Sequence, residues 1–149
     1  MPFISIFANL KRNNRLKDKE KIMKTKIHTD LAPAAIGPYS QGLAFKDMVF
    51  TSGQLPLDPT TMAFVEGGIK EQARQSLANL KAVLEESGAG LDTVLKTTCF
   101  LSDMENFVAF NEVYTEVFGT DVAPARSCVE AARLPKDALV EVEAIAFIK

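Results

Sequence analysis

The chain has 149 residues, of which 47% are hydrophobic and 24% are charged, a balance typical of one globular domain with a substantial core. Its apolar runs fall short of the roughly 20 residues that cross a bilayer, which argues against a membrane protein. The two cysteines, Cys99 and Cys128, are too few for a disulfide scaffold. We therefore expect a cytoplasmic protein with reduced thiols.

The first 26 residues differ in charge from the rest of the chain. They hold eight of the 17 Lys and Arg residues but two of the 19 Asp and Glu residues, which leaves the remainder with a net charge of −8. An acidic body argues against a broad nucleic-acid surface. Met23 suggests that the functional protein begins near this residue and that Met1 comes from an upstream start codon. We therefore predict that residues 1–23 form a flexible, dispensable extension before a domain at 24–149.

From Ile27 onward the hydrophobic pattern predicts the element order β-β-β-α-β-α-β-β. Residues 39–45 and 48–55 are rich in β-forming side chains and flank a tight turn, so both are predicted strands. Within 69–87, apolar side chains recur at helical spacing, and this pattern stops at Gly88.

A fourth strand and a second helix follow. Residues 93–101 are strand-like, and Ser102 with Glu105 forms a capping-box signature for the next helix. The segments 124–130 and 140–146 are the last two predicted strands. Two amphipathic helices can cover one face of six strands. The predicted fold class is therefore α+β, a six-stranded mixed sheet with two helices on one face.

Polar side chains lie on the last two predicted strands. Alternation puts Arg126, Cys128 and Glu130 on one face of the first. In the second, alternate apolar residues form a core face, and Glu141 points the other way. We therefore expect one side of the sheet to pack the core and the other side to carry Arg126, Cys128 and Glu141.

Several candidate site residues have two possible interpretations. A strand arginine is a rigid fork suited to a carboxylate ligand, but Arg126 can also form a structural ion pair with a glutamate. Cys128 is either a nucleophile, which usually needs a basic partner, or a small half-buried strand residue. Tyr39 is either a hydrogen-bond donor near a site or a packed ring. For Asn111 we expect a solvent-exposed helix amide.

Much chemistry is excluded by composition. His28 is the only histidine, so a histidine-based triad and a zinc site with several imidazoles are both ruled out. There is no glycine-rich phosphate loop followed by Lys and Ser or Thr. We therefore expect no metal and no cofactor, and mild chemistry on a small substrate that is already reactive.

The sheet face that the helices leave uncovered carries large apolar residues. Leu139, Ile145 and Phe147 alternate with the core residues of the last strand. On a monomer they would form an exposed apolar patch. We therefore expect a homo-oligomer, with Arg126 and Glu141 near a subunit boundary.

Six segments in order along the chain carry a resemblance to a known family. They are residues 35–41 (Ala-Ile-Gly-Pro-Tyr-Ser-Gln), 52–56 (Ser-Gly-Gln-Leu-Pro), 110–114 (Phe-Asn-Glu-Val-Tyr), 124–130 (Pro-Ala-Arg-Ser-Cys-Val-Glu), 133–137 (Arg-Leu-Pro-Lys-Asp) and 140–146 (Val-Glu-Val-Glu-Ala-Ile-Ala). Together they closely resemble the signature of the RidA (YjgF-like) family, over roughly residues 24–149.

This resemblance implies a chorismate-mutase-like fold, assembled as a homotrimer with ligand sites in the clefts between subunits. It also implies an activity: hydrolysis of reactive 2-imino acids and their enamine tautomers, such as 2-iminobutanoate and 2-iminopropanoate, to 2-oxo acids and ammonia. Such imines are released by pyridoxal-phosphate enzymes, and the reaction removes them before they damage other enzymes. No cofactor is implied.

The resemblance also implies roles for individual residues. Arg126 would bind the substrate carboxylate, and Glu141 would orient or deprotonate the attacking water. The residues expected to line the pocket are Tyr39, Ser52, Gly53, Asn111 and Cys128. Backbone groups at Gly53 and Cys128 would meet the imine nitrogen.

Three other functions remain open at this point. One is a regulatory trimer that binds small carboxylates without turnover, and another is an endoribonuclease or translation inhibitor. The third is a holdase-like chaperone, which needs an exposed apolar surface. The acidic body and the missing histidine pair argue against the ribonuclease, and nucleic acid is therefore not an expected partner.

Overall fold

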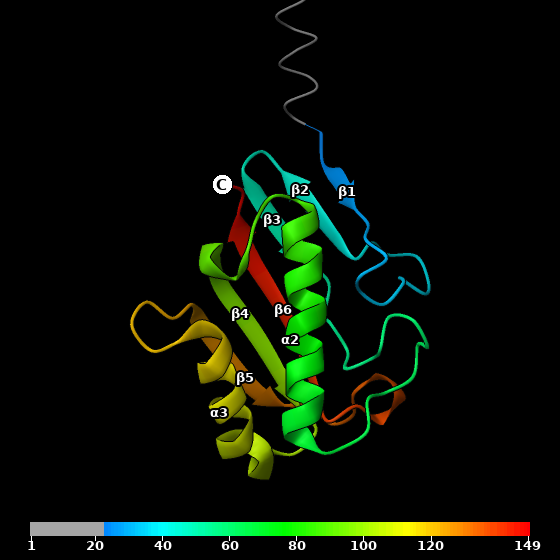
Figure 1. Cartoon of the computed structure of the whole chain (residues 1–149), viewed down its shortest axis with the longest axis vertical. Coiled ribbons are helices and arrows are strands. Elements are labelled where there is room, and N and C mark those ends of the chain that lie inside the picture. The colour runs from blue at the N-terminus through cyan, green and yellow to red at the C-terminus, as the bar shows by residue number, and fades with distance from the viewer. Residues whose placement is uncertain (1–22) are drawn as a thin grey trace, which may run out of the picture.

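A computed structural model describes residues 23–149 and contains a six-stranded sheet with the order β1-β2-β3-β6-β4-β5 (Figure 1). The strands are β1 (Thr25–Ile27), β2 (Gly42–Phe45), β3 (Met48–Thr51), β4 (Val94–Leu101), β5 (Ala125–Glu130) and β6 (Val140–Phe147), and the helices are α2 (Ile69–Glu86) and α3 (Phe107–Phe118). The predicted element order is confirmed. The predicted extension at 1–23 lies outside the described residues, apart from Met23.

The sheet is mixed, as predicted. β4 and β5 run parallel, and the other neighbouring pairs are antiparallel. A parallel pair needs a crossover connection, and α3 supplies it between β4 and β5. This places β5 at the edge of the sheet, next to β4 alone.

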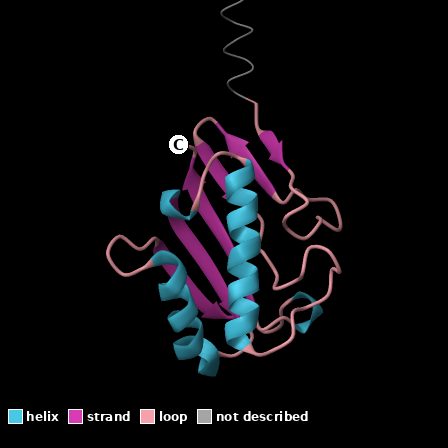
Figure 2. Cartoon of the chain, in the orientation of Figure 1, coloured by secondary structure: helices cyan, strands magenta, loops and turns pink. Residues whose placement is uncertain are grey.

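Both helices lie on the same face of the sheet (Figure 2). The alternate residues of β6 that face them are all buried, namely Val140, Val142, Ala144 and Ala146. α2 contributes three leucines with essentially no exposed surface, Leu77, Leu80 and Leu84. Burial of each leucine stabilises the fold by roughly 2 kcal/mol, so this layer is the main core of the domain.

Two predicted strands are shorter than expected. The first starts at Gly42 rather than residue 39, because the side chain of Gln41 is buried in contacts with the preceding loop. The second ends at Thr51, and beyond it only Gln54 returns to the sheet, through an isolated bridge to Val142. The chain between these points forms loops, and these loops carry Tyr39, Ser52 and Gly53.

The start of the second helix also differs from the prediction. Ser102 still belongs to the extended chain, where its N–H donates to the carbonyl of Leu139 at 3.1 Å. Asp103 caps a short 3₁₀ turn (Met104–Asn106) by accepting from the N–H of Glu105, and α3 follows. The predicted cap at Ser102 is therefore wrong by one residue: the strand ends at Leu101 as predicted, and the carboxylate of Asp103 caps the turn in place of the Ser102 hydroxyl.

The face of the sheet opposite the helices is uncovered within one chain. Phe50 and Phe147 lie on it with 45% and 40% of their surfaces exposed, beside Ile145, which pairs with Phe50. Leu139 precedes β6 and is partly buried. Among the described residues, no helix is long and apolar enough to span a membrane.

Candidate active site

Arg126 lies on the edge strand β5, and its side chain is held against α3. Its Nη1 donates a hydrogen bond to Oδ1 of Asn111 at 2.8 Å. Its guanidinium lies over the ring of Tyr114, with Cζ 4.6 Å from the ring centroid. Phe107 contributes a second ring at 5.6 Å. A strand fixes the start of the side chain and a helix fixes its end, so the guanidinium is positioned before any ligand arrives.

The alternative of a structural ion pair for Arg126 is wrong. Ion pairs occur within residues 23–149, but none of them includes Arg126. Glu130, on the same face of β5, instead accepts a hydrogen bond from the N–H of Met104 at 2.8 Å. The expectation of a solvent-exposed Asn111 is also wrong, because Asn111 is partly buried and engaged by Arg126. The charge of Arg126 is therefore available to an anionic ligand.

Cys128 lies two residues after Arg126 and pairs across the strands with Cys99. Cys128 is partly buried, and both thiols are free. Burial raises the pKa of Cys128, and the charge of Arg126 lowers it by a smaller amount. Burial raises the pKa of Cys99 to about 12. Both thiols are therefore neutral near pH 7, which favours the structural interpretation of Cys128 over a nucleophile.

We expect Cys128→Ser to keep most of the activity of the protein, within about threefold, because a hydroxyl replaces a neutral thiol of similar size. The measurement is steady-state turnover of the imine substrate proposed below. A variant that keeps its native oligomeric mass yet shows no turnover would contradict this and reopen covalent catalysis.

Glu141 lies on β6, and Gly53 is packed directly against it. A Cβ added at Gly53 would overlap the carboxyl group of Glu141, so a larger residue would force this carboxyl group to move. Burial raises the pKa of Glu141, and repulsion from Glu143 raises it further. A carboxylate with a raised pKa in a partly buried position can accept a proton from water more readily than an exposed one.

Two cavities lie beside the loops that carry Tyr39, Ser52 and Gly53. One cavity of about 260 Å³ is lined by Tyr39, Gly53 and mostly apolar neighbours. The other, of about 530 Å³, is lined by Tyr39 and Ser52. The Tyr39 hydroxyl accepts from the N–H of Ile36 at 3.3 Å, and 51% of its surface is exposed. Tyr39 is therefore a hydrogen-bonding loop residue and not a packed ring.

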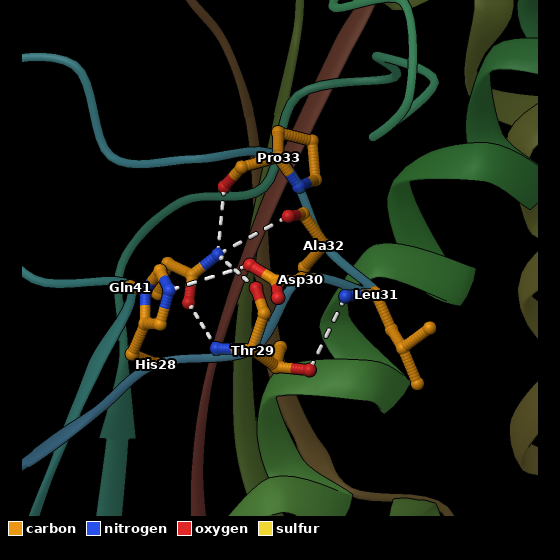
Figure 3. Close-up of polar contacts among 7 residues, drawn as sticks. All are labelled: His28, Thr29, Asp30, Leu31, Ala32, Pro33 and Gln41. Carbon is orange, nitrogen blue, oxygen red and sulfur yellow. Dashed lines mark hydrogen bonds and ion pairs between the residues drawn. The ribbon is translucent and has the colours of Figure 1, made fainter.

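Gln41 holds the loop that carries Tyr39, and sequence reasoning missed this role. Its amide nitrogen donates to the carbonyls of Thr29, Ala32 and Pro33, and its Oε1 accepts from the N–H of Thr29 at 2.8 Å (Figure 3). The Gln41 side chain is buried, with 2% of its surface exposed. It supplies hydrogen bonds to backbone groups of this irregular segment that a neighbouring strand would otherwise supply. The sequence signal for this role is a single amide side chain, Gln41, within the predicted strand at 39–45.

The predicted single polar face is wrong. Thr97 of β4 pairs with Arg126, whereas Phe100 of β4 pairs with Glu141. Residues three apart in a strand point to opposite faces, so Arg126 and Glu141 lie on opposite sides of the sheet. Arg126 is on the helix side because β5 is an edge strand whose face packs on the aromatic rings of α3. The predicted residues thus form two groups: Asn111, Arg126 and Cys128, and Tyr39, Ser52, Gly53 and Glu141.

Known proteins of similar sequence cover nearly the whole described domain. A family model described as Endoribonuclease L-PSP matches residues 29–148. A protein of Salmonella typhimurium named 2-iminobutanoate/2-iminopropanoate deaminase is 51% identical over 126 residues, which are 83% of this chain and 98% of the relative. A RutC family protein of Synechocystis is 52% identical over 123 residues, 82% of this chain and 95% of the relative.

Solved structures agree with the sequence relatives. The structure of Escherichia coli TdcF with bound serine has a TM-score of 0.80 at 44% identity and covers 84% of this chain and 99% of its own. Yeast Mmf1 has a TM-score of 0.81 at 43% identity and covers 85% and 100%. The chain therefore belongs to the RidA (YjgF-like) family, which the matching model describes as Endoribonuclease L-PSP.

Proposed function

We propose that this protein is a cytoplasmic deaminase that hydrolyses 2-imino acids such as 2-iminobutanoate and 2-iminopropanoate. Water adds to the carbon of the protonated imine, the C–N bond breaks, and the products are a 2-oxo acid and ammonium. The reaction would remove reactive imines released by pyridoxal-phosphate enzymes. Relatives at about half identity that are named for this activity support the proposal.

The observation that carries the proposal is the arrangement around Arg126. An arginine that is held by an amide and by aromatic rings keeps its positive charge free for an anion. Its remaining N–H donors form a planar fork that matches a carboxylate. Every substrate of the proposed class carries a carboxylate beside the reacting carbon, so binding at Arg126 would fix the position of that carbon.

Glu141 would act on the attacking water. Protonation makes the imine carbon electrophilic, so the protein needs only to place a water and accept its proton as the C–O bond forms. A carboxylate whose pKa is raised suits this role. Backbone groups of Gly53 and Cys128 would contact the imine nitrogen.

The two residue groups lie on opposite faces of one sheet, so we propose that each complete site forms between two copies of the chain. One copy would supply Arg126 with Asn111 and Cys128, and its neighbour would supply Glu141 with Gly53. The exposed face around Phe50 would pack between copies. A closed ring of three chains, joined head to tail, gives three equivalent sites.

The experiment that tests the function generates imines in the cuvette with a threonine dehydratase or an amino acid oxidase. The measured quantity is the rate of 2-oxo acid formation, with and without this protein. We expect faster release of 2-oxobutanoate in its presence, compared with the same mixture that contains boiled protein. Equal rates in both mixtures, from a folded protein, would contradict the proposal and favour a binding protein without turnover.

The rate should fall as the pH is lowered through the raised pKa of Glu141, because a protonated carboxyl group cannot accept a proton. Glu143→Gln removes the repulsion that helps to raise this pKa. We therefore expect Glu143→Gln to move the acid limb of the profile of kcat/KM against pH toward lower pH and to leave the plateau unchanged. An acid limb that stays in place or moves to higher pH would contradict the role of Glu141.

A further inference from the structure

Tyr114 lies at the centre of the contacts around Arg126. It comes from the buried side of α3, with 6% of its surface exposed. Its hydroxyl is 2.7 Å from Oγ1 of Thr97, which is fully buried on β4. Phe118 packs against its ring at 4.6 Å between centroids. The ring therefore cannot turn away without breaking a buried hydrogen bond and an aromatic contact.

The fixed ring faces the guanidinium of Arg126. Tyr114 is the aromatic ring closest to Cζ of Arg126, at 4.6 Å, while Phe107 and Phe110 lie at 5.6 and 6.0 Å. A cation over a ring face is attracted by the ring quadrupole, and burial of the ring strengthens this attraction. The ring face offers the guanidinium N–H groups no conventional hydrogen-bond acceptor, so this contact does not compete with a carboxylate for them.

We propose that Tyr114 is a positioning residue, which orders Arg126 for a carboxylate ligand through its ring face and is itself oriented by Thr97. The inference rests on the proposed function for the identity of the ligand. A free arginine side chain loses rotamer freedom when it binds, whereas one that is already ordered loses less. Tyr114 thus contributes to affinity without touching the substrate.

The test compares variants at position 114 by the dissociation constant for 2-oxobutanoate, measured by titration calorimetry, and by KM and kcat for imine hydrolysis. Tyr114→Leu removes the ring and should weaken 2-oxobutanoate binding and raise KM by about tenfold, with kcat within about threefold. Tyr114→Phe keeps the ring face and should stay within about threefold of wild type. Val113→Ala is the matched control: it removes buried apolar volume from the same helix, so it should lower the Tm and leave 2-oxobutanoate binding unchanged.

A further substitution keeps the role of Tyr114 testable if Tyr114→Leu does not fold. Replacement of Tyr114 by a trifluorinated phenylalanine keeps the ring and its packing but weakens the negative potential of the ring face. We expect it to bind 2-oxobutanoate at least about threefold more weakly than Tyr114→Phe. Equal binding by these two proteins, or wild-type binding by Tyr114→Leu, would overturn the inference.

The binding comparison does not require turnover. Wild-type protein that binds 2-oxobutanoate but does not hydrolyse imines would refute the proposed function, and the fluorinated variant would still decide the role of Tyr114. If Arg126→Ala binds 2-oxobutanoate as tightly as wild type, no carboxylate is held by Arg126, and the inference fails with it.

Discussion

Arg126→Ala should lower kcat/KM for imine hydrolysis by about 100- to 1000-fold, because it removes the charge-assisted hydrogen bonds to the substrate carboxylate. The variant should remain folded. Arg126 makes no ion pair among the described residues, so its removal leaves no buried partner charge unpaired. Arg126→Lys should also lose at least about tenfold, because an ammonium cannot form the bidentate contact. The measurement is 2-oxo acid release from imines generated in place.

Arg74 provides the matched control for this prediction. It lies on the exposed side of α2 and pairs with Glu116 at 3.0 Å, so Arg74→Ala removes the same charge from the protein surface. Exposed ion pairs contribute little to stability, and we expect wild-type kinetics. A rate for Arg126→Ala that matches that of Arg74→Ala would refute the carboxylate-binding role.

Glu141→Gln should lower kcat by about 100-fold or more, because an amide keeps the shape of the side chain but cannot accept a proton. The thermal stability of Glu141→Gln, by contrast, should not fall. The pKa of Glu141 is raised in the folded state, so folding binds protons at this residue, and its contribution to stability falls as the pH rises through that pKa. At neutral pH the neutral glutamine should therefore give an equal or higher Tm.

Glu143→Gln distinguishes a local effect from a general change of charge. It lies on the same face of β6, two residues further along, and removes the same charge. At neutral pH we expect it to retain the wild-type rate. If Glu141→Gln lowered the rate only as much as Glu143→Gln does, a role for Glu141 in proton transfer would be excluded.

The sequence predicted the element order and the core because these depend on local periodicity. The spacing of Leu77, Leu80 and Leu84 defines the buried side of α2, and the alternation in β6 defines the face that packs on it. Boundaries were less accurate where side chains compete with the backbone. Gln41 and Asp103 both make such contacts, and both shift an element end.

The site was predicted residue by residue but not in its spatial arrangement. Which face of the sheet Arg126 occupies depends on the register between β4 and β5, which no local pattern reports. The contact of Arg126 with Asn111 and Tyr114 could have been anticipated in part. These two residues are three apart on α3, and that spacing places them on the same side of a helix.

The most direct test of the account combines the two inactive variants. Arg126→Ala and Glu141→Gln are unfolded together in equal amounts and refolded, and mixed assemblies are verified by native mass spectrometry. Each site needs Arg126 from one chain and Glu141 from its neighbour, so every mixed trimer contains one intact site. Random mixing should then restore about a quarter of the wild-type rate, while each variant refolded alone stays inactive. Mixed assemblies without restored activity would contradict a site shared between copies.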